Sequence, residues 1–373
     1  SAWPPMASVA SAADGGNGGG SSSSGALVVD CGSFALRGGL AAHARPQASV
    51  EVPPISSRDR GVLDPELWHE LLDRRLGVDT STRPVVIGIP VMASRQVREE
   101  LAQLLFERFK APSVFIGSTA FLCILGAGLS TALVIDIGES GTTVVPVDEG
   151  HPQAHSAVRN SIGGFALSNA MALLMQDAGC MVPEGLTWPI AGRLAKERLG
   201  HVATKDFEIE LRDDLSSIAG QPRCCELPGS SVAFEAKAGE GLRCTEQLFN
   251  PSSVVGGEIR GCVGISDLAM NSLRLQSDIS LRGKMLENIL LVGGSSMFAG
   301  LQERLSHELK MKSPWVAPGT KVENVRVHAL ADRDILAWLG GAALAECDVL
   351  RQLCTSRKDF FKNGPVAIHR RFI

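Results

Sequence analysis

The chain has 373 residues, of which 45% are hydrophobic and 20% are charged. This composition is typical of globular proteins and excludes a mostly disordered, collagen-like or coiled-coil chain. Its 36 Lys and Arg residues against 40 Asp and Glu residues give a net charge of −4, which provides no general attraction to nucleic acid or to an anionic membrane. We therefore expect no direct contact with nucleic acid.

The chain begins with a polar segment, residues 1 to about 25, that is rich in Gly and Ser. Such a segment buries too little apolar area to offset the entropy of ordering, so we expect a flexible tail. It shows no basic region followed by an apolar core, and we predict no secretory signal. The nine cysteines have no CxxC spacing, which fits reduced thiols in an intracellular protein better than a zinc ribbon or a disulfide framework.

The folded part begins with a strand pattern that occurs twice. Ala26-Leu-Val-Val-Asp30-Cys-Gly32 recurs as Ala132-Leu-Val-Ile-Asp136-Ile-Gly138, and both copies are apolar strands that end in Asp-x-Gly. Backbone N–H groups at such a turn can bind phosphate oxygens, and the carboxylate can hold a hydrated Mg²⁺ ion. One copy alone would indicate only a hairpin turn. The pair suggests two phosphate loops on duplicated lobes.

Between the two copies the pattern alternates strands and helices. Pro84–Pro90 reads as a buried strand, and Ser94 is the expected N-cap of a helix that stops before Pro112. The apolar positions of this helix fall roughly on one face. They are Val97, Leu101, Leu104, Leu105 and Phe109.

One uncharged stretch is as long as a membrane span. No charged residue occurs in the 25 residues between Lys110 and Asp136. The stretch is interrupted by Pro112, Gly117, Gly126 and Gly128, so it fits a buried strand, helix, turn and strand better. We predict no membrane span.

The second half continues the alternation. We predict helices at Phe165 to about Gln176, at Ala191 to about Leu199 and at about Gly300 to Lys310. Residues 213–232 contain Gly220, Pro222, Pro228 and Gly229 and read as an exposed connection. A strand at 289–292 leads into the turn Gly293-Gly294-Ser295-Ser296-Met297, where a Gly pair lets a ligand approach the backbone. Alternating strands and helices predict a layered α/β fold.

From Ala26 to Ile373 these residues resemble the actin and actin-related protein family, within the wider group of actins, sugar kinases and heat-shock chaperone ATPases. The segments that carry the resemblance are Val28–Ser33, Val134–Gly138, Leu248–Ser252, Glu287–Met297, Trp338–Gly341 and Gly364–Arg370. The resemblance implies a duplicated α/β ATPase fold with two lobes around a nucleotide cleft. The first lobe would span 26–160, with 335–373 returning to it, and the second 161–334. The small subdomain would be reduced to about 47–60.

The resemblance also implies a site for ATP or ADP with Mg²⁺. Asp30, Gly32 and Ser33 would lie in the first phosphate loop and Asp136 and Gly138 in the second. Asp30 and Asp136 would hold the metal through water. Arg37 replaces a phosphate-contacting lysine of the family, which keeps the charge but not the geometry.

The remaining implied contacts come from three further segments. Ser140 replaces a glycine of the second loop and Gly141 follows it, so we expect this loop to be slightly reshaped. Gly164, Lys196 and Glu197 match positions around adenine and ribose, although the residues alone predict a solvated helical face for Lys196 and Glu197. The third contact is the turn that contains Gly293, Gly294, Ser295 and Met297.

Three substitutions depart from the family pattern. Phe34 stands where conventional actin has a glycine, and its bulk restricts approach to the β-phosphate. Thr119 and Thr143 stand where actin has a glutamine and a histidine that orient the attacking water. Since positioning supplies most of phosphoryl-transfer catalysis, we expect nucleotide binding without useful hydrolysis and assign no catalytic residue.

A deletion bears on assembly. Only 14 residues lie between Pro46 and Gly61, where conventional actin has a longer subdomain whose loop contacts the next filament subunit. We therefore do not expect a homopolymer.

These features favour a structural subunit of a multiprotein assembly, with other subunits, actin or another actin-related protein as partners. A chromatin-remodelling complex in the nucleus is favoured by the plant-type opening at Ala26. The alternatives are a dynactin-type pointed-end component of the cytoplasmic cytoskeleton and a conventional filament-forming actin ATPase. A sugar or acetate kinase is disfavoured by the actin-type ending through Gly364-Pro365 and His369-Arg370.

Overall fold

The computed structural model describes residues 25–53, 61–182, 184–204, 207–217, 223–226, 233–236, 239–253 and 261–372. The predicted tail lies outside the described residues except for Gly25. Residues 54–60 of the predicted reduced subdomain lie outside them too, as do Gly220, Pro222, Pro228 and Gly229. The chain forms two compact units. Unit 1 takes its described residues from 1–132, 147–154 and 335–373, and unit 2 from 133–146 and 155–334.

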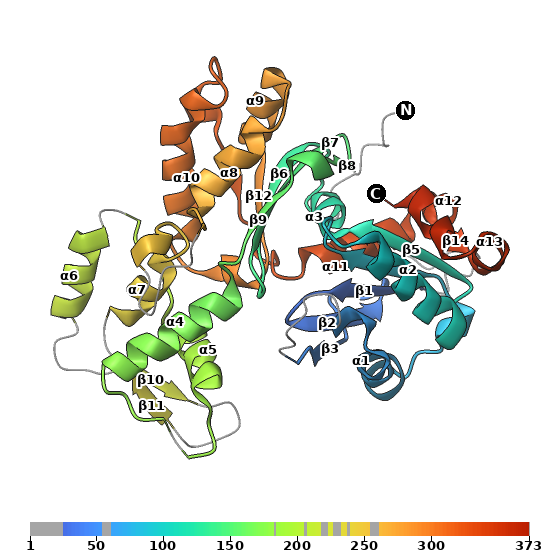
Figure 1. The fold of residues 1–373 in the computed structure, drawn as a ribbon, viewed down its shortest axis with the longest axis horizontal. Coiled ribbons are helices and arrows are strands. Elements are labelled where there is room, and N and C mark those ends of the chain that lie inside the picture. The colour runs from blue at the N-terminus through green and yellow to red at the C-terminus, as the bar shows by residue number, and fades with distance from the viewer. Residues whose placement is uncertain are drawn as a thin grey trace, which may run out of the picture. The chain divides into compact units, whose positions relative to one another are not determined.

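Unit 1 is built on a six-stranded mixed sheet (Figure 1). Its strand order is β14 (Thr355–Ser356), β5 (Ser113–Ser118), β4 (Val85–Ile89), β1 (Leu27–Cys31), β2 (Ala35–Leu40) and β3 (Ala48–Glu51). The central strands β1, β4 and β5 run parallel and are almost completely buried, as expected for strands covered on both faces. Strand β3 lies at the edge, where the Arg75 Nη1 donates to the Ser49 carbonyl at 2.8 Å.

Helices cover both faces of this sheet. They are α1 (Pro65–His69), α2 (Arg95–Gln103), α3 (Thr119–Gly126), α11 (Leu336–Glu346), α12 (Leu350–Leu353) and α13 (Arg357–Asn363), with a final 3-10 segment at Pro365–Arg371. One core contains the fully buried Trp68, Leu101 and Phe106. On the other side Trp338 of α11 donates to the Val28 carbonyl at 3.1 Å, which fixes α11 against β1.

The helix after Ser94 changes its winding part way along. Ser94 caps it as predicted, with its hydroxyl accepting from the Val97 N–H at 3.2 Å. The α-helix then gives way to a π-helical segment at Leu104–Arg108. Lys110 ends it in a left-handed conformation, with φ of 58°. Leu105 and Phe106 of the π-helical segment are both buried.

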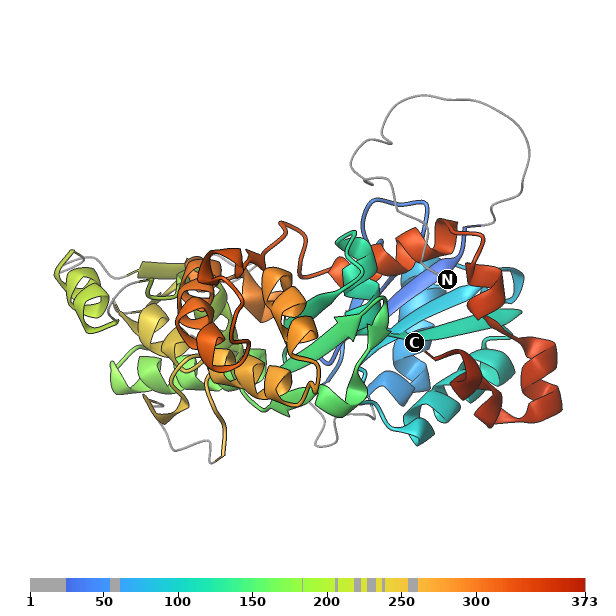
Figure 2. The same cartoon turned by 90° about the horizontal axis from the view of Figure 1, so that it is seen from above.

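Unit 2 holds most of a second mixed sheet (Figure 2). Its order is β13 (Val327–His328), β12 (Ile289–Val292), β6 (Ala132–Ile137), β7 (Thr142–Asp148) and β8 (His151–Pro152), and β9 (Val158–Asn160) also pairs with β7. The end of β7 and β8 belong to the residues of unit 1. The helices are α4 (Gly164–Asp177), α5 (Trp188–Leu199), α6 (Phe207–Ser217), α7 (Glu240–Glu246), α8 (Ile265–Arg274), α9 (Ile279–Glu287) and α10 (Leu301–Lys312).

Most of the predicted elements are confirmed, and one prediction is wrong in part. The uncharged stretch after Lys110 forms β5, α3 and β6 as predicted. Among the described helices, none combines the length and apolar composition that a membrane span requires. Residues 213–232 are not simply a connection, because 213–217 end α6 and Arg223–Glu226 is β10, which pairs with β11 (Ala233–Ala236). Of the Pro and Gly residues that suggested a connection, Gly220 and Pro222 precede β10 in the sequence, and Pro228 and Gly229 come between β10 and β11.

The thiols fit the predicted reduced state. The cysteines whose side chains the structure describes are thiols that are not joined in disulfides. They are Cys31, Cys123, Cys180, Cys244, Cys262, Cys347 and Cys354.

Helices α3 and α11 of unit 1 pack so closely that a glycine is required between them. A Cβ atom on Gly340 would overlap the Leu122 carbonyl oxygen and lie 3.0 Å from the Gly126 nitrogen. We expect Gly340→Ala to lower the free energy of unfolding by about 3 kcal/mol or more, because backbone atoms would have to move. Gly25→Ala is the matched control, since its Cβ would meet only Leu40 Cβ at 3.9 Å. Urea denaturation of both variants measures the difference, and equal effects would contradict the expectation.

Candidate functional site

In unit 1 the first candidate loop is a tight turn between β1 and β2. The Gly32 N–H donates to the Ala35 carbonyl at 3.1 Å, which reverses the chain directly after Cys31. A Cβ atom on Gly32 would lie 3.0 Å from the same carbonyl oxygen, so a side chain is disfavoured there. Ser33 is exposed at the tip of the turn and Phe34 is half-buried. The Phe34 carbonyl accepts from the N–H of Val52, the residue after β3, at 2.8 Å, which fixes the backbone of this bulky residue.

Asp30 is a buried carboxylate at the end of β1. Only 8% of the residue is exposed, and burial raises the pKa of its carboxyl to about 6, with Arg37 opposing the shift. Arg37 is its cross-strand partner on β2, and Arg37 Nη1 lies 3.9 Å from Asp30 Oδ2. A carboxylate that burial destabilises gains from a cation, so Asp30 fits the proposed Mg²⁺. In the described parts of the chain, no group of three or more His, Cys, Asp or Glu side chains forms a metal site.

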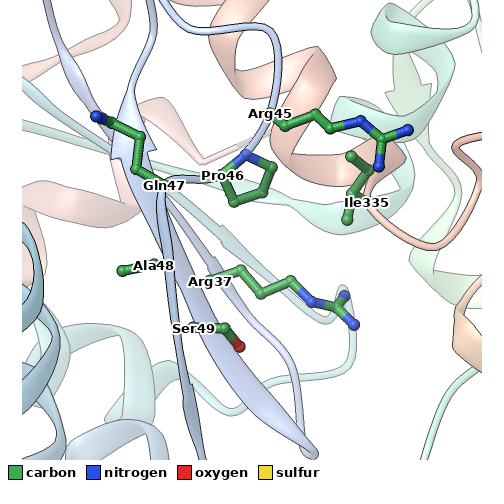
Figure 3. Close-up of a pocket in the computed structure, with 7 residues that line it drawn as sticks. All are labelled: Arg37, Arg45, Pro46, Gln47, Ala48, Ser49 and Ile335. Atoms are coloured by element: carbon green, nitrogen blue, oxygen red, sulfur yellow. The ribbon is translucent and has the colours of Figure 1, made fainter.

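Arg37 also lines an open pocket of unit 1, which the sequence did not predict (Figure 3). The pocket has a volume of about 340 Å³ and is lined by Arg37, Arg45, Pro46, Gln47, Ala48, Ser49 and Ile335. Figure 3 shows the guanidinium groups of Arg37 and Arg45 extending toward the same side. Arg45 therefore adds a second cation beside the predicted phosphate contact. Its sequence signal was weak, because a lone Arg after a turn usually belongs to a solvated surface.

Thr119 lies close to the same carboxylate. A Cβ atom built on Gly88 of β4 would be 3.6 Å from Thr119 Cγ2 and 3.7 Å from Asp30 Oδ1. Thr119 thus presents a short side chain near Asp30, with no amide that could reach further. Thr143 lies in unit 2, half-buried on β7 opposite Arg159.

In unit 2 the second candidate loop is joined to the start of α4. The Gly138 N–H donates to the Gly141 carbonyl at 3.1 Å, and the Gly138 carbonyl accepts from the Gly164 N–H at 2.8 Å. A Cβ atom on Gly163 would overlap the Gly138 carbonyl and lie 2.5 Å from the Gly141 nitrogen. Glycine is therefore required at position 163, where the start of α4 meets this loop.

Ser140 is held by an arginine of the adjacent strand. Arg159 Nη2 donates to the Ser140 carbonyl at 2.9 Å and to its hydroxyl at 2.7 Å. The loop that carries Ser140 is thus fixed by Arg159. The next residue, Gly141, has a φ of 149°.

The third candidate turn lies against the end of β6. Val292 pairs with Asp136 in register, and a Cβ atom on Gly293 would overlap Asp136 Oδ1. Gly293 has a φ of 93°, which also favours glycine. Gly294 is exposed with open space around it, Ser295 is buried, and Met297 is 43% exposed.

Lys196 is buried, so the prediction of a solvated face is wrong for this residue. It is 4% exposed, its Nζ donates to the Gly164 carbonyl at 3.0 Å, and burial lowers its pKa. A Cβ atom on Gly164 would overlap Glu139 Oε2 and lie 2.9 Å from Ser295 Oγ. Gly164 therefore brings the second loop, the third turn and Lys196 together. Glu197, the next residue on α5, is exposed, as the residues alone predict.

Each unit thus carries its own set of clustered candidate residues. Unit 1 brings together Asp30, Gly32, Ser33 and Arg37, to which Arg45 is added. Unit 2 brings together Asp136, Gly138, Ser140, Gly141, Gly164, Lys196, Gly293 and Ser295, while Gly294 and Met297 are exposed in the same turn and Glu197 faces solvent. Both sets contain a strand-end aspartate beside glycine backbone, which is the chemistry that binds phosphates and a hydrated divalent cation.

Comparison with known protein families identifies the chain. The family model described as Actin matches residues 59–186 and 192–373. The chain therefore belongs to the actin family, and its two-sheet α/β architecture is that of the actin ATPase fold. The first candidate loop, with Asp30 and Arg37, lies before the matched residues.

The raised pKa of Asp30 predicts a pH dependence of stability. Its ordinary value is 3.8 and its folded value about 6, so between these values the folded state retains a proton that the unfolded state releases. The free energy of unfolding should therefore fall as pH rises from about 4 to about 6, by up to about 3 kcal/mol. In Asp30→Asn this component should be absent, as urea denaturation of ligand-free protein at several pH values would show.

Asp278→Asn is the matched control. Asp278 caps α9 by accepting a hydrogen bond from the Ser280 N–H at 2.8 Å. Hydrogen bonds from the Ser280 hydroxyl and from backbone N–H groups lower the pKa of Asp278. Its contribution to stability has the opposite sign and is lost as pH falls. If Asp30→Asn kept the pH dependence of the unchanged protein, the burial of Asp30 would not be its cause.

Proposed function

We propose that this member of the actin family is a nucleotide-binding subunit of a multiprotein assembly that does not usefully hydrolyse its nucleotide. The proposal depends mainly on one observation: a strand-end aspartate beside glycine backbone occurs in both units, at Asp30 and at Asp136. A single strand-end turn could be only structural. Two such turns, with the cations of Arg37 and Arg45 near one of them, support binding of ATP or ADP with Mg²⁺.

Each group has a defined task in this proposal. By the family resemblance, the carboxylates of Asp30 and Asp136 would hold Mg²⁺ through its water molecules, and the ion would neutralise phosphate charge. The guanidinium of Arg37 balances negative charge beside Asp30. Gly32, Gly138 and Gly293 carry no side chain, which lets a phosphate approach the backbone of their turns, while their own N–H groups donate to the Ala35, Gly141 and Arg333 carbonyls. Lys196 holds the Gly164 carbonyl and thereby keeps the start of α4 in place.

Weak hydrolysis follows from the two threonines. Thr119 is too short to position water as an amide of greater length would, and Thr143 has no imidazole. Loss of both orienting groups leaves substrate binding in place but removes the positioning on which phosphoryl transfer depends.

We further propose that the assembly is a chromatin-remodelling complex. The support is the plant-type opening of the chain at Ala26. A dynactin-type pointed-end role remains the alternative, supported by Pro112-Ser-Val and Ala337–Gly341 and by the short segment between Pro46 and Gly61. The two roles differ in compartment, since the first requires the nucleus and the second the cytoplasm.

Binding without turnover can be measured on the purified full chain. In excess Mg²⁺–ATP, calorimetry should detect binding while phosphate release stays at the level of a protein-free sample. The double variant Thr119→Gln, Thr143→His should restore measurable release, because it returns both orienting groups. Thr131→Gln is the control, since Thr131 bonds Asp148 Oδ1 at 3.2 Å, away from the candidate loops. Appreciable phosphate release by the unchanged protein would contradict the proposal.

Affinity purification of the full chain, followed by mass spectrometry, tests the assembly. We expect stoichiometric recovery with other subunits, chromatin remodellers in a nuclear extract for the favoured role and dynactin subunits in a cytoplasmic extract for the alternative. Light scattering of the protein alone in polymerising salt should not rise steeply with concentration, since the segment between Pro46 and Gly61 is short. A lone monomer, or a steep rise, would refute an assembly role of this kind.

A further inference from the structure

Trp315 in unit 2 is a tryptophan held in solvent by a rigid turn. It is 82% exposed, whereas Ser313 and Val316 on either side are 0% and 1% exposed. The Ser313 hydroxyl donates to the Lys310 carbonyl at 3.0 Å, and the Val316 N–H donates to the Ser313 carbonyl at 3.1 Å. Since the turn is anchored on both sides of Trp315, the exposure of this side chain is imposed by the fold.

Three more apolar side chains are exposed on the neighbouring elements. Leu275 and Ile279 flank the turn between α8 and α9 and are 51% and 50% exposed, and Met311 at the end of α10 is 67% exposed. We call Leu275, Ile279, Met311 and Trp315 the Trp315 patch. Figure 1 shows α8, α9 and α10 side by side in this unit.

A single arginine holds the two parts of the Trp315 patch together. Arg282 Nε donates to the Gln276 carbonyl at 2.8 Å, and Arg282 Nη1 donates to the Val316 carbonyl at 3.0 Å. Gln276 follows Leu275, and Val316 follows Trp315, so one guanidinium fixes both apolar residues near each other. On the same side, a Cβ atom on Gly283 would lie 2.8 Å from Thr320 Oγ1. The patch is therefore preformed, and binding to it would cost little ordering entropy.

The surroundings of the Trp315 patch are basic. Segments 274–284 and 310–322 contain six Lys and Arg residues and one acidic residue, although the whole chain has a net charge of −4. Arg274, Lys284 and Lys321 are exposed. The acidic residue, Asp278, is engaged as the N-cap of α9. Three further acids lie nearby: Lys312 pairs with Asp267 at 2.7 Å and with Glu308 at 3.7 Å, and Glu323 is exposed next to the second segment. The six basic residues still outnumber the four acidic ones, so the charge around the apolar centre is moderately positive.

We infer that the Trp315 patch is a docking surface for an acidic segment of a partner protein that carries an apolar anchor side chain. Exposed tryptophans with apolar neighbours are typical centres of protein interfaces, and a charged rim selects a partner of opposite sign. A nucleic acid fits less well, because the net negative chain repels an extended polyanion and the patch centre is apolar. The inference rests on the proposal that the protein works within an assembly, and it assigns one surface to that role.

Photo-cross-linking from position 315 tests the inference in the full chain. Trp315 is replaced by p-benzoylphenylalanine, the protein is expressed in its native cells, and cross-linked peptides are identified after purification of the assembly. We expect cross-links to a protein segment that is rich in Asp and Glu and contains a large apolar residue. The same replacement at Met181, which is 84% exposed and outside the patch, is the control and should not reach that segment.

Variants quantify the contribution of each feature. Trp315→Ala, and separately the pair Arg274→Glu and Lys321→Glu, should each lower recovery of the identified partner at least tenfold, with Met181→Ala within twofold of the unchanged protein. The thermal midpoint of Trp315→Ala should stay close to that of the unchanged protein, because an exposed side chain contributes little to stability. Loss of recovery in Trp315→Ala together with unfolding would attribute the effect to folding and overturn the inference.

The remaining outcomes separate this inference from the proposed function. Cross-links to nucleic acid, to a basic segment or to a second copy of this chain would overturn the inference. Recovery of an intact assembly with no cross-link from position 315 would overturn it too and leave the assembly role standing. A lone monomer would overturn both.

Discussion

The buried carboxylate of Asp30 is the constraint from which the chemistry of unit 1 follows. A strand end that buries an acid must be balanced by positive charge, and the antiparallel pairing of β1 with β2 places Arg37 directly opposite. The distance of 3.9 Å is too long for a tight ion pair, so burial still raises the pKa of the acid. Unit 1 therefore keeps a carboxylate whose charge an additional cation would stabilise, at a cost to its own folding.

Unit 2 holds its candidate loops together mainly by close backbone packing, whereas unit 1 relies on an opposite charge. Its second loop, its third turn and the start of α4 approach one another at Gly163, Gly164 and Gly293, where any Cβ atom would collide with a neighbouring oxygen or nitrogen. These contacts fix the loops without side chains in the way. Lys196 donates to the Gly164 carbonyl and Arg159 to the Ser140 carbonyl, and these bonds hold the loops further.

Much of this arrangement could be predicted from local sequence, and the parts that could not depend on tertiary contacts. The apolar runs that end at Asp30 and Asp136 predict β1 and β6, because a buried strand requires a run of consecutive apolar residues. The burial of Lys196 could not be predicted, since helical spacing does not reveal that the Gly164 carbonyl lies within its reach. Arg45 was missed because a lone exposed Arg after a turn gives no local sign that the fold brings it into one pocket with Arg37. The pairing of β10 with β11 was missed because short strands separated by Pro and Gly resemble a loop.

The hydrogen bond from Arg75 to Ser49 has a consequence for solubility. Strand β3 is the last strand of its sheet, and an open edge of this kind presents backbone groups to which another chain can add as a further strand. The Arg75 guanidinium occupies one of those carbonyl oxygens and places a charge beside it. At Ser49, therefore, a side chain of the same unit competes with strand addition, and its charge opposes the approach of an apolar strand from another chain.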